Sequence, residues 1–359
     1  TMSEPTTTPG ADPATTRINR DETEVGSVFV SNYPAYSFWD EEDVPKARQA
    51  LASPPNPDSQ LGLYLHIPFC RKRCKFCYFR VYTDKNADQI QTYLDALARE
   101  VEHYAQQPAI QGRPLHFVYF GGGTPSYISS RHLRALVERI KDVMPWDQAD
   151  EIAFECEPGT LTKAKLETIR DIGVTRLSLG LENLNDEILH HNGRAHVSKE
   201  IYQAMPWVKE LDFDQVNVDL IAGMVGETWE RWRETVQKTI DLDPDTVTVY
   251  QMELPYNTVY SKDLLSGDSE AIPLADWKTK RAWHAYAFEQ FAAAGYTRSS
   301  AYTMKKTPEA RFVYRDAVWT GQDMIGAGVA SFSHMNGVHY QNAPRWDDYL
   351  GTIDRGDLP

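Results

Sequence analysis

The chain has 359 residues and a formal net charge of −14, from 37 basic and 51 acidic side chains. This acidic balance disfavours nucleic acid as a partner, because binding to phosphate needs clustered Lys and Arg. No stretch approaches the roughly 18 consecutive apolar residues of a membrane span. The first 26 residues are rich in Thr, Pro and Asp and lack the apolar segment of a signal peptide. The length predicts two or three domains, or one large α/β unit with additions.

The chain begins with two segments of different character. Residues 1–26 are predicted to be a disordered leader, because their composition offers little apolar surface to bury. Residues 27–60 carry aromatic residues and prolines. We expect them to pack as an extended N-terminal arm with a short helix.

From residue 61 the hydrophobic pattern becomes regular. Short apolar or β-branched runs predict strands at 63–67, 116–120, 151–157, 176–182, 215–221 and 246–252. Helical patterns occupy about 87–107, 129–143, 162–172, 184–210 with a break, and 228–242. Such alternation predicts an α/β fold of βαβ units with a parallel sheet. Six units favour an open, partial (β/α)6 barrel over residues 61–255 rather than a closed eight-stranded one. Residues 256–359 are predicted to be a C-terminal accessory region that opens with a helix at about 276–294 and continues with strand-like pieces.

Three of the four cysteines lie within eight residues, Cys70, Cys74 and Cys77, directly after the first predicted strand. This spacing is typical of a metal site in a reducing cytoplasm rather than of a disulfide framework. Three thiolates can hold three irons of a cubane cluster and leave the fourth iron open. A zinc site with His66 as a fourth ligand, or three cysteines without metal, are the alternatives. Cys156 stands alone on the third strand and is interpreted as a small buried apolar residue.

The CxxxCxxC motif at the end of the first strand resembles the signature of the radical S-adenosylmethionine (SAM) superfamily. Further segments resemble the oxygen-independent coproporphyrinogen III oxidase (HemN)-like family: YLHIPFC at 64–70, YFGGGTP at 119–125, LSLGLE at 177–182, NGR at 192–194 and NVDLI at 217–221. The resemblance implies a partial radical SAM barrel. It also implies a [4Fe–4S] cluster on Cys70, Cys74 and Cys77, whose open iron is chelated by SAM. One electron from the cluster would then release a 5′-deoxyadenosyl radical.

The resemblance also implies a set of SAM-binding residues. Glycines permit close approach of the backbone to the methionine end of SAM, and Arg194 would pair with its carboxylate. The carboxylates at the strand ends would meet its amino group and ribose, and Phe76 would flank the adenine. The implied set is Phe76, Gly121, Gly122, Gly123, Thr124, Glu155, Glu182, Arg194 and Asp219. The alternatives are a tight turn for the glycines, a surface ion pair for Arg194, pairing with Lys or Arg for the carboxylates, and core packing for Phe76. Relatives commonly carry Gln where this chain has Glu182.

Three branches of the family compete. Coproporphyrinogen III decarboxylases resemble this chain but carry a fourth cysteine where Phe79 stands here. Heme chaperones begin almost directly at the segment matching Tyr64, whereas this chain has an arm first. The HemN-like class C methyltransferases and cyclopropanases are the most similar branch in Arg71-Lys72-Arg73 and in the arm at 32–39, so methyl or methylene transfer to an sp² carbon is our first expectation.

That branch implies two SAM molecules in one active site. Tyr64, with Gly326 and Gly328 in the 324–331 segment, is the candidate second SAM site, and a buried strand of small residues is the alternative reading of that segment. Tyr64, Tyr250 and Glu253 are the candidate catalytic residues, the last two on the substrate side, and His334 and His339 are further candidates.

The expected partners are a small substrate with an sp² carbon and an electron donor such as flavodoxin or ferredoxin. The C-terminal region is expected to be incomplete, because relatives continue into a helical segment.

Overall fold

The computed structural model describes residues 34–255, 257–266 and 274–359. The predicted leader at 1–26 and the start of the arm lie outside the described residues. The strands are β1 (Leu61–Ile67), β2 (Leu115–Gly122), β3 (Glu151–Cys156), β4 (Arg176–Glu182), β5 (Gln215–Ala222), β6 (Thr246–Gln251), β7 (Thr297–Arg298), β8 (Thr303–Lys305), β9 (Asp323–Ala327), β10 (Phe332–Met335) and β11 (Val338–Gln341).

The α-helices are α1 (Val44–Ala52), α2 (Ala87–Tyr104), α3 (Ser130–Val143), α4 (Lys163–Asp171), α5 (Asp186–His191), α6 (Ser198–Glu210), α7 (Trp229–Leu242), α8 (Val259–Ser266), α9 (Trp277–Ala293), α10 (Val313–Trp319) and α11 (Trp346–Asp354). Short 3₁₀ helices are η1 (Tyr36–Phe38), η2 (Glu41–Asp43), η3 (Pro125–Tyr127) and η4 (Pro158–Thr160).

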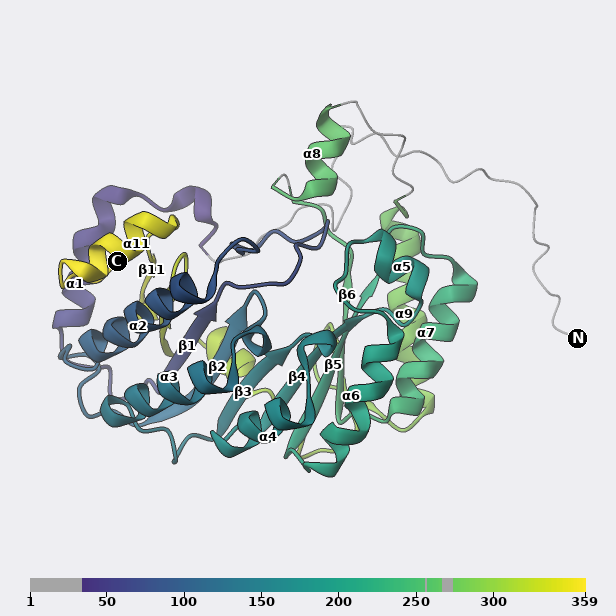
Figure 1. Ribbon diagram of the computed structural model, residues 1–359, viewed down its shortest axis with the longest axis horizontal. Helices are drawn as coiled ribbons and strands as arrows, with labels where there is room; N and C mark the ends of the chain where they lie inside the picture. Colours follow the sequence, from purple (N-terminus) through teal and green to yellow (C-terminus); the bar gives the residue numbers. More distant parts are fainter. Residues whose placement is uncertain (1–33, 256, 267–273) are drawn as a thin grey trace, which may run out of the picture.

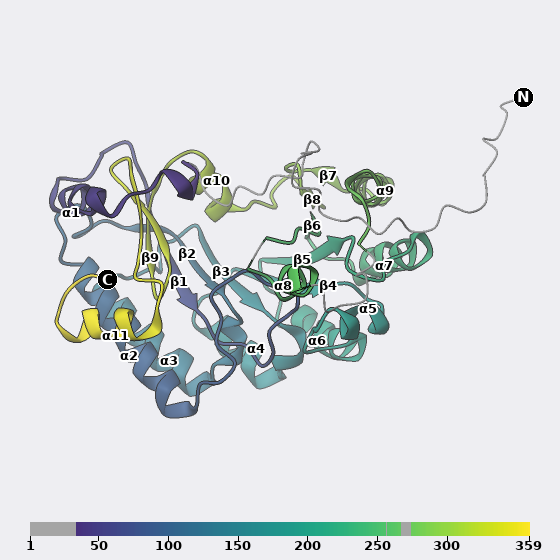
Figure 2. The ribbon, with the colours of Figure 1, turned by 90° about the horizontal axis from the view of Figure 1, so that it is seen from above.

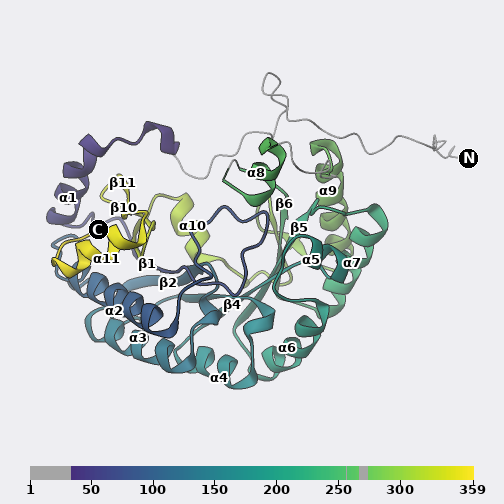
Figure 3. The same cartoon turned by 45° about the horizontal axis from the view of Figure 1, so that its top comes forward.

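The strands form one sheet in the order β11-β10-β9-β1-β2-β3-β4-β5-β6-β8-β7. Neighbouring strands from β1 to β6 are parallel. Figure 3 shows α2, α3, α4, α6 and α7 in an arc along the outer side of the sheet, with the long loop after β1 on the inner side. The prediction of an open α/β partial barrel is confirmed, because the sheet ends in two separate edges instead of closing.

Local sequence signals explain where the helices begin and which face they bury. The helices α2, α3, α4, α5, α7 and α9 each follow a side chain that accepts a backbone hydrogen bond from the first turn: Asn86, Ser129, Thr162, Asn185, Thr228 and Asp276. In α2 the buried residues Ile90, Leu94, Leu97 and Val101 recur every three or four positions and face the sheet. The break predicted within 184–210 is the gap between α5 and α6.

The C-terminal region extends the sheet at both edges (Figure 1). Strand β9 pairs in parallel with β1, with Tyr64 opposite Gly326, and β10 and β11 continue that edge as a hairpin. At the other edge β8 pairs antiparallel with β6. Figure 2 shows α10 on the side of the sheet opposite to α3 and α4. The sequence predicts strand-like pieces in this region, but not that one of them lies beside β1.

Aliphatic and aromatic side chains between the sheet and the outer helices make up the core. Trp146 and Trp232 are its largest fully buried side chains. Within the part of the chain that the structure describes, we find no helix with the length and apolar character needed to cross a membrane.

Candidate active site

A cavity of about 620 Å³ opens at the carboxyl ends of the parallel strands. This is the end at which α/β barrels carry their active sites, because the loops that follow each strand converge there. Most of the predicted site residues line it: Cys70, Cys74, Phe76, Cys77, Gly122, Gly123, Thr124, Glu155, Glu182, Arg194, Asp219, Tyr250 and Glu253. These residues are far apart in the sequence. They meet in one cavity because most of them lie at the ends of strands of the same sheet.

The three clustered cysteines are free thiols that are partly exposed to this cavity. The hydroxyl of Thr124 donates to the sulfur of Cys70 over 3.3 Å, and Arg194 donates from Nη1 to the sulfur of Cys74 over 3.4 Å. Burial raises the pKa of the Cys70 thiol to about 12 and that of Cys77 to about 11. Uncoordinated thiols at these two positions are therefore protonated at neutral pH, and iron would have to displace those protons.

Glycine leaves room beside the first cysteine. A Cβ at Gly123 would lie 3.0 Å from the sulfur of Cys70 and 2.9 Å from the carbonyl carbon of Pro68. The residues present fit an iron–sulfur cluster, since three thiols and donors to two of their sulfurs surround one open space. The residue Cys156 is 4% exposed, as its interpretation as a buried residue predicts, although it also borders the cavity.

Arg194 is held beside the cysteines with part of its guanidinium unused. Its Nη2 donates to the carbonyl of Gly180 over 2.7 Å, and its Nη1 lies 3.7 Å from Oε1 of Glu182. Its Nε is buried and has no hydrogen-bond partner among the described residues. Burial raises the pKa of Glu182 to about 7, against the opposing effect of Arg194. An unpaired buried donor beside a cavity fits a ligand with a carboxylate group.

Two more carboxylates lie at the ends of neighbouring strands. Tyr119 donates its hydroxyl proton to Oε1 of Glu155 over 2.5 Å, and burial raises the pKa of Glu155 to about 7. Asp219 accepts from Ser178 over 3.1 Å and from Asn217 over 2.9 Å. Buried carboxylates facing a cavity are costly without a partner, so they fit a ligand with amino and hydroxyl donors.

Comparison with known proteins decides the family. The model of the radical SAM superfamily matches residues 64–239. The oxygen-independent coproporphyrinogen III oxidase of Synechocystis sp. is 28% identical over 343 residues, which cover 92% of this chain and 72% of that protein. The solved structure of coproporphyrinogen III oxidase (HemN) from Escherichia coli, a radical SAM enzyme, has a TM-score of 0.78 at 25% identity and covers 92% of this chain and 77% of that one. The chain belongs to the radical SAM superfamily.

A heme chaperone is among the relatives as well. HemW of Bacillus subtilis is 26% identical over 308 residues, which cover 82% of this chain and 76% of that protein. Membership of the radical SAM superfamily implies a [4Fe–4S] cluster and SAM, and the cysteine loop described above fits them. None of these three relatives is a C-methyltransferase or a cyclopropanase, so they lend no support to the expectation of methyl or methylene transfer.

Other predicted residues lie outside the lining of this cavity. Tyr64 stacks on Tyr119 with ring centroids 5.8 Å apart, and its hydroxyl lies 3.2 Å from Nδ1 of His66. Gly121 packs on the same tyrosines, since its Cβ would lie 2.8 Å from Tyr119 and 3.0 Å from Tyr64. Burial lowers the pKa of His66 to about 4, so its ring is neutral.

The glycines predicted for a second SAM site pack against protein. A Cβ at Gly326 would lie 2.1 Å from the carbonyl oxygen of Phe332, and one at Gly328 would lie 2.5 Å from the hydroxyl of Tyr93. His334 and His339 face each other across the β10–β11 hairpin, also outside the cavity lining. In this structure Gly326 and Gly328 serve close packing of β9, the alternative reading of that segment.

Part of the cavity lining is aromatic. Tyr250 and Tyr302 stack with centroids 6.1 Å apart, and Tyr78 and Phe79 stack with centroids 4.5 Å apart. The exposed fractions of Tyr250, Phe79 and Tyr302 are 47%, 48% and 41%, so these side chains remain partly accessible to a ligand.

A carboxylate lies beside these rings. Oε2 of Glu253 is buried and has no hydrogen-bond partner among the described residues. Burial raises the pKa of Glu253, and the nearby Lys280 opposes that effect.

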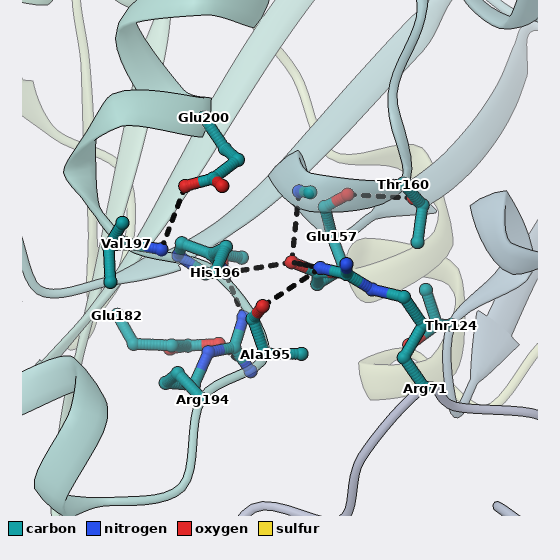
Figure 4. Close-up of polar contacts among 12 residues, drawn as sticks. Arg71, Thr124, Glu157, Thr160, Glu182, Arg194, Ala195, His196, Val197 and Glu200 are labelled. Atoms are coloured by element: carbon teal, nitrogen blue, oxygen red, sulfur yellow. Dashed lines mark hydrogen bonds and ion pairs between the residues drawn. The ribbon is translucent and has the colours of Figure 1, made fainter.

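The cluster of polar side chains around Glu157, shown in Figure 4, was not predicted from the sequence. Glu157 accepts from Arg71 and lies 2.9 Å from Nδ1 of His196. The spacing in the sequence could have indicated both Glu157 and His196. Glu157 follows Glu155 by two positions at a strand end, and His196 follows Arg194 by two positions in a loop that closes on the cavity.

Proposed function

We propose that this chain is a radical SAM enzyme that acts on a large, carboxylate-bearing substrate of the tetrapyrrole type, in the manner of coproporphyrinogen III oxidases. The observation that carries the proposal is that one cavity is lined both by three cysteine thiols and by two stacked aromatic pairs. The coproporphyrinogen III oxidases among the relatives support it.

The cysteine side of the cavity would hold the cofactors. Cys70, Cys74 and Cys77 would hold the [4Fe–4S] cluster. When bound, the cluster and SAM would supply a 5′-deoxyadenosyl radical after transfer of one electron, from a donor such as flavodoxin or ferredoxin. Arg194 would pair with the carboxylate of SAM through its free Nε, while Glu155 and Asp219 would accept from the amino group and the ribose. Glu182 would also accept from the amino or hydroxyl donors of SAM.

The aromatic side of the cavity would position the substrate. The rings of Tyr250 and Phe79 offer packing surfaces for the pyrrole rings of a tetrapyrrole. Lys72 and Arg73 also line the cavity and could pair with substrate carboxylates. Loss of a hydrogen atom from a propionate side chain, release of CO₂ and transfer of one electron to an external acceptor would leave a vinyl group. Glu253 and Tyr250 are the nearby groups able to hold or move a proton.

Methyl or methylene transfer to an sp² carbon with two SAM molecules is the second candidate. Phe79 favours it, because the decarboxylases that the chain resembles carry a fourth cysteine at that position. In the structure Phe79 presents an apolar ring to the cavity beside Tyr78. Tyr64, Gly326 and Gly328 lie outside the cavity lining, so a second SAM would need an approach that this arrangement of β9 does not offer.

One experiment separates the candidates. The protein is reconstituted with iron and sulfide without oxygen, given SAM, dithionite and coproporphyrinogen III, and analysed by mass spectrometry. Formation of 5′-deoxyadenosine together with a product that has lost the elements of formic acid for each vinyl group supports the proposal. S-adenosylhomocysteine rising with 5′-deoxyadenosine on an alkene or heteroaromatic substrate would replace it with methyl or methylene transfer. Tight binding of one heme per chain without SAM cleavage would indicate a chaperone.

A further inference from the structure

One carboxylate, Glu157, lies at the point where three segments of the active site meet (Figure 4). It follows β3, and its Oε1 accepts from the backbone N–H of Gly159 over 2.9 Å. Its two oxygens accept from Arg71 over distances of 2.9 to 3.2 Å. Its Oε1 lies 2.9 Å from Nδ1 of His196. The side chain of Glu157 is therefore saturated by groups from the cysteine loop, its own turn and the 194–196 segment.

Arg71 occupies a slot shaped for its guanidinium. A Cβ at Gly159 would lie 2.0 Å from Nη2 of Arg71, so only glycine leaves this space free. The same Nη2 donates to the carbonyl of Ala195 over 3.0 Å. A planar fork that binds a carboxylate and a carbonyl at once fixes both direction and distance, which a lysine ammonium does not.

These contacts lead directly to two cluster ligands. Arg71 follows Cys70 in the chain, and Ala195 follows Arg194, which donates to the sulfur of Cys74. The backbone N–H of Glu157 donates to Oγ of Ser126, two residues after Thr124, which donates to the sulfur of Cys70. One carboxylate thus connects the segments that set the positions of both sulfurs.

The arrangement is partly shielded from water. The exposed fractions of the side chains are 10% for Glu157, none for His196 and 38% for Arg71. An ion pair with one partner this buried constrains the positions of its side chains more than a surface pair does, because water solvates its charges less.

We propose that Glu157 is a positioning residue that holds the cysteine loop in place for the cluster, through Arg71 on one side and His196 on the other. The proposal concerns how the cluster is retained and does not depend on the substrate. Replacing Glu157 with Gln removes the charge and one acceptor oxygen while keeping the size of the side chain, so the loop at 70–77 loses its fixed contact with β3.

The test measures how firmly the reconstituted protein holds iron. Wild type, Glu157→Gln and Arg71→Ala are challenged without oxygen by an iron chelator, and iron release is followed over time. Hydrogen exchange of the loop at 70–77 in the protein without iron provides a second readout, independent of the cluster. Glu102→Gln is the matched control, since Glu102 binds Arg139 over 2.8 and 3.1 Å on the outer helices and Arg139 has the same 38% exposure as Arg71.

We expect both active-site variants to lose iron roughly 10- to 100-fold faster than wild type, the range found for residues that orient metal ligands. Their loop amides should exchange faster, while the control resembles wild type in both readouts. Arg71→Ala removes a partly exposed side chain, so it tests the proposal even where Glu157→Gln unfolds. Iron release and loop exchange at wild-type rates in Arg71→Ala would overturn the proposal.

Discussion

Arg194 donates from Nη1 to the sulfur of Cys74 across 3.4 Å, while its Nε is buried without a partner among the described residues. One side chain thus touches a proposed cluster ligand and still offers a donor to a second ligand in the same cavity. The side chain of Arg194 is 11% exposed, and an unused donor on a side chain this buried is costly unless a ligand binds it.

Arg194→Ala should therefore weaken binding of SAM. A hydrogen bond to a charged group contributes about 1.5–3 kcal/mol, so the Kd for SAM should rise by roughly tenfold or more. Equilibrium dialysis of SAM against the reconstituted protein measures the change, with Arg139→Ala on the outer helices as the control. An unchanged Kd in Arg194→Ala would remove this residue from the SAM site.

The four cysteines should respond differently to substitution. Cys70→Ala, Cys74→Ala and Cys77→Ala should each abolish SAM cleavage, because each removes one of the three thiols proposed to hold the cluster. Cys156→Ala should retain the cluster, since its thiol is buried on β3. The measurements are the iron content per chain and the yield of 5′-deoxyadenosine for each variant. A Cys156 variant that alone lost its cluster would contradict the ligand assignment.

Gly328→Ala should destabilise the protein more than Gly295→Ala. Both glycines have positive φ, +110° and +94°, so alanine adds backbone strain of about 1–2 kcal/mol at either position. At Gly328 the new Cβ would also lie 2.8 Å from the Cβ of His66, whereas nothing lies within 4 Å at Gly295. We expect a further loss of about 1–3 kcal/mol at Gly328 from this overlap. Denaturant unfolding compares the two variants, and equal losses would show that β9 is not tightly packed on β1.

Glu100 should make the free energy of unfolding depend on pH. It lies buried in α2 and accepts from the N–H of Gly328 over 2.8 Å, from Asn342 over 2.6 Å and from Tyr349 over 2.6 Å. Burial raises its pKa from 4.5 to about 7. The folded state therefore binds more protons than the unfolded state between these values, and stability falls as pH rises through that window.

The size of this effect is on the order of 3 kcal/mol at its upper limit, because the pKa of Glu100 rises from 4.5 to about 7. Glu100→Gln cannot titrate, so the difference in unfolding free energy between the variant and wild type should change in favour of the variant from pH 4.5 to 7. Chemical denaturation at a series of pH values measures this difference. A constant difference would show that the pKa of Glu100 is not raised in the folded protein.

The strands and helices that position the site follow from local sequence patterns. The run at 176–182 alternates large apolar residues with small or polar ones, and β4 spans the same residues. The cysteines, the glycine turn after β2 and the carboxylates at strand ends could be placed together because parallel strands end at a common edge. Arg194 needed the family resemblance, since an arginine in a loop carries no local signal of its own.

What the sequence did not reveal depends on contacts between distant residues. The pairing of β9 with β1 joins Gly326 to Tyr64 across more than 250 positions, and no local pattern specifies that partner. The contact between Arg71 and Glu157 has the same character, because a basic residue in an exposed-looking loop is indistinguishable from a solvated one until the fold brings a carboxylate beside it. For the same reason Tyr302 was not expected in the cavity.

We propose that Cys70, Cys74 and Cys77 hold a [4Fe–4S] cluster with one iron open to SAM. Electron paramagnetic resonance of the reconstituted, dithionite-reduced protein, recorded with and without SAM, tests it most directly. We expect about four irons per chain and a reduced-cluster signal that changes when SAM is added, because SAM becomes a ligand of the open iron. A signal that SAM leaves unchanged, or a protein that binds zinc and no cluster, would contradict it.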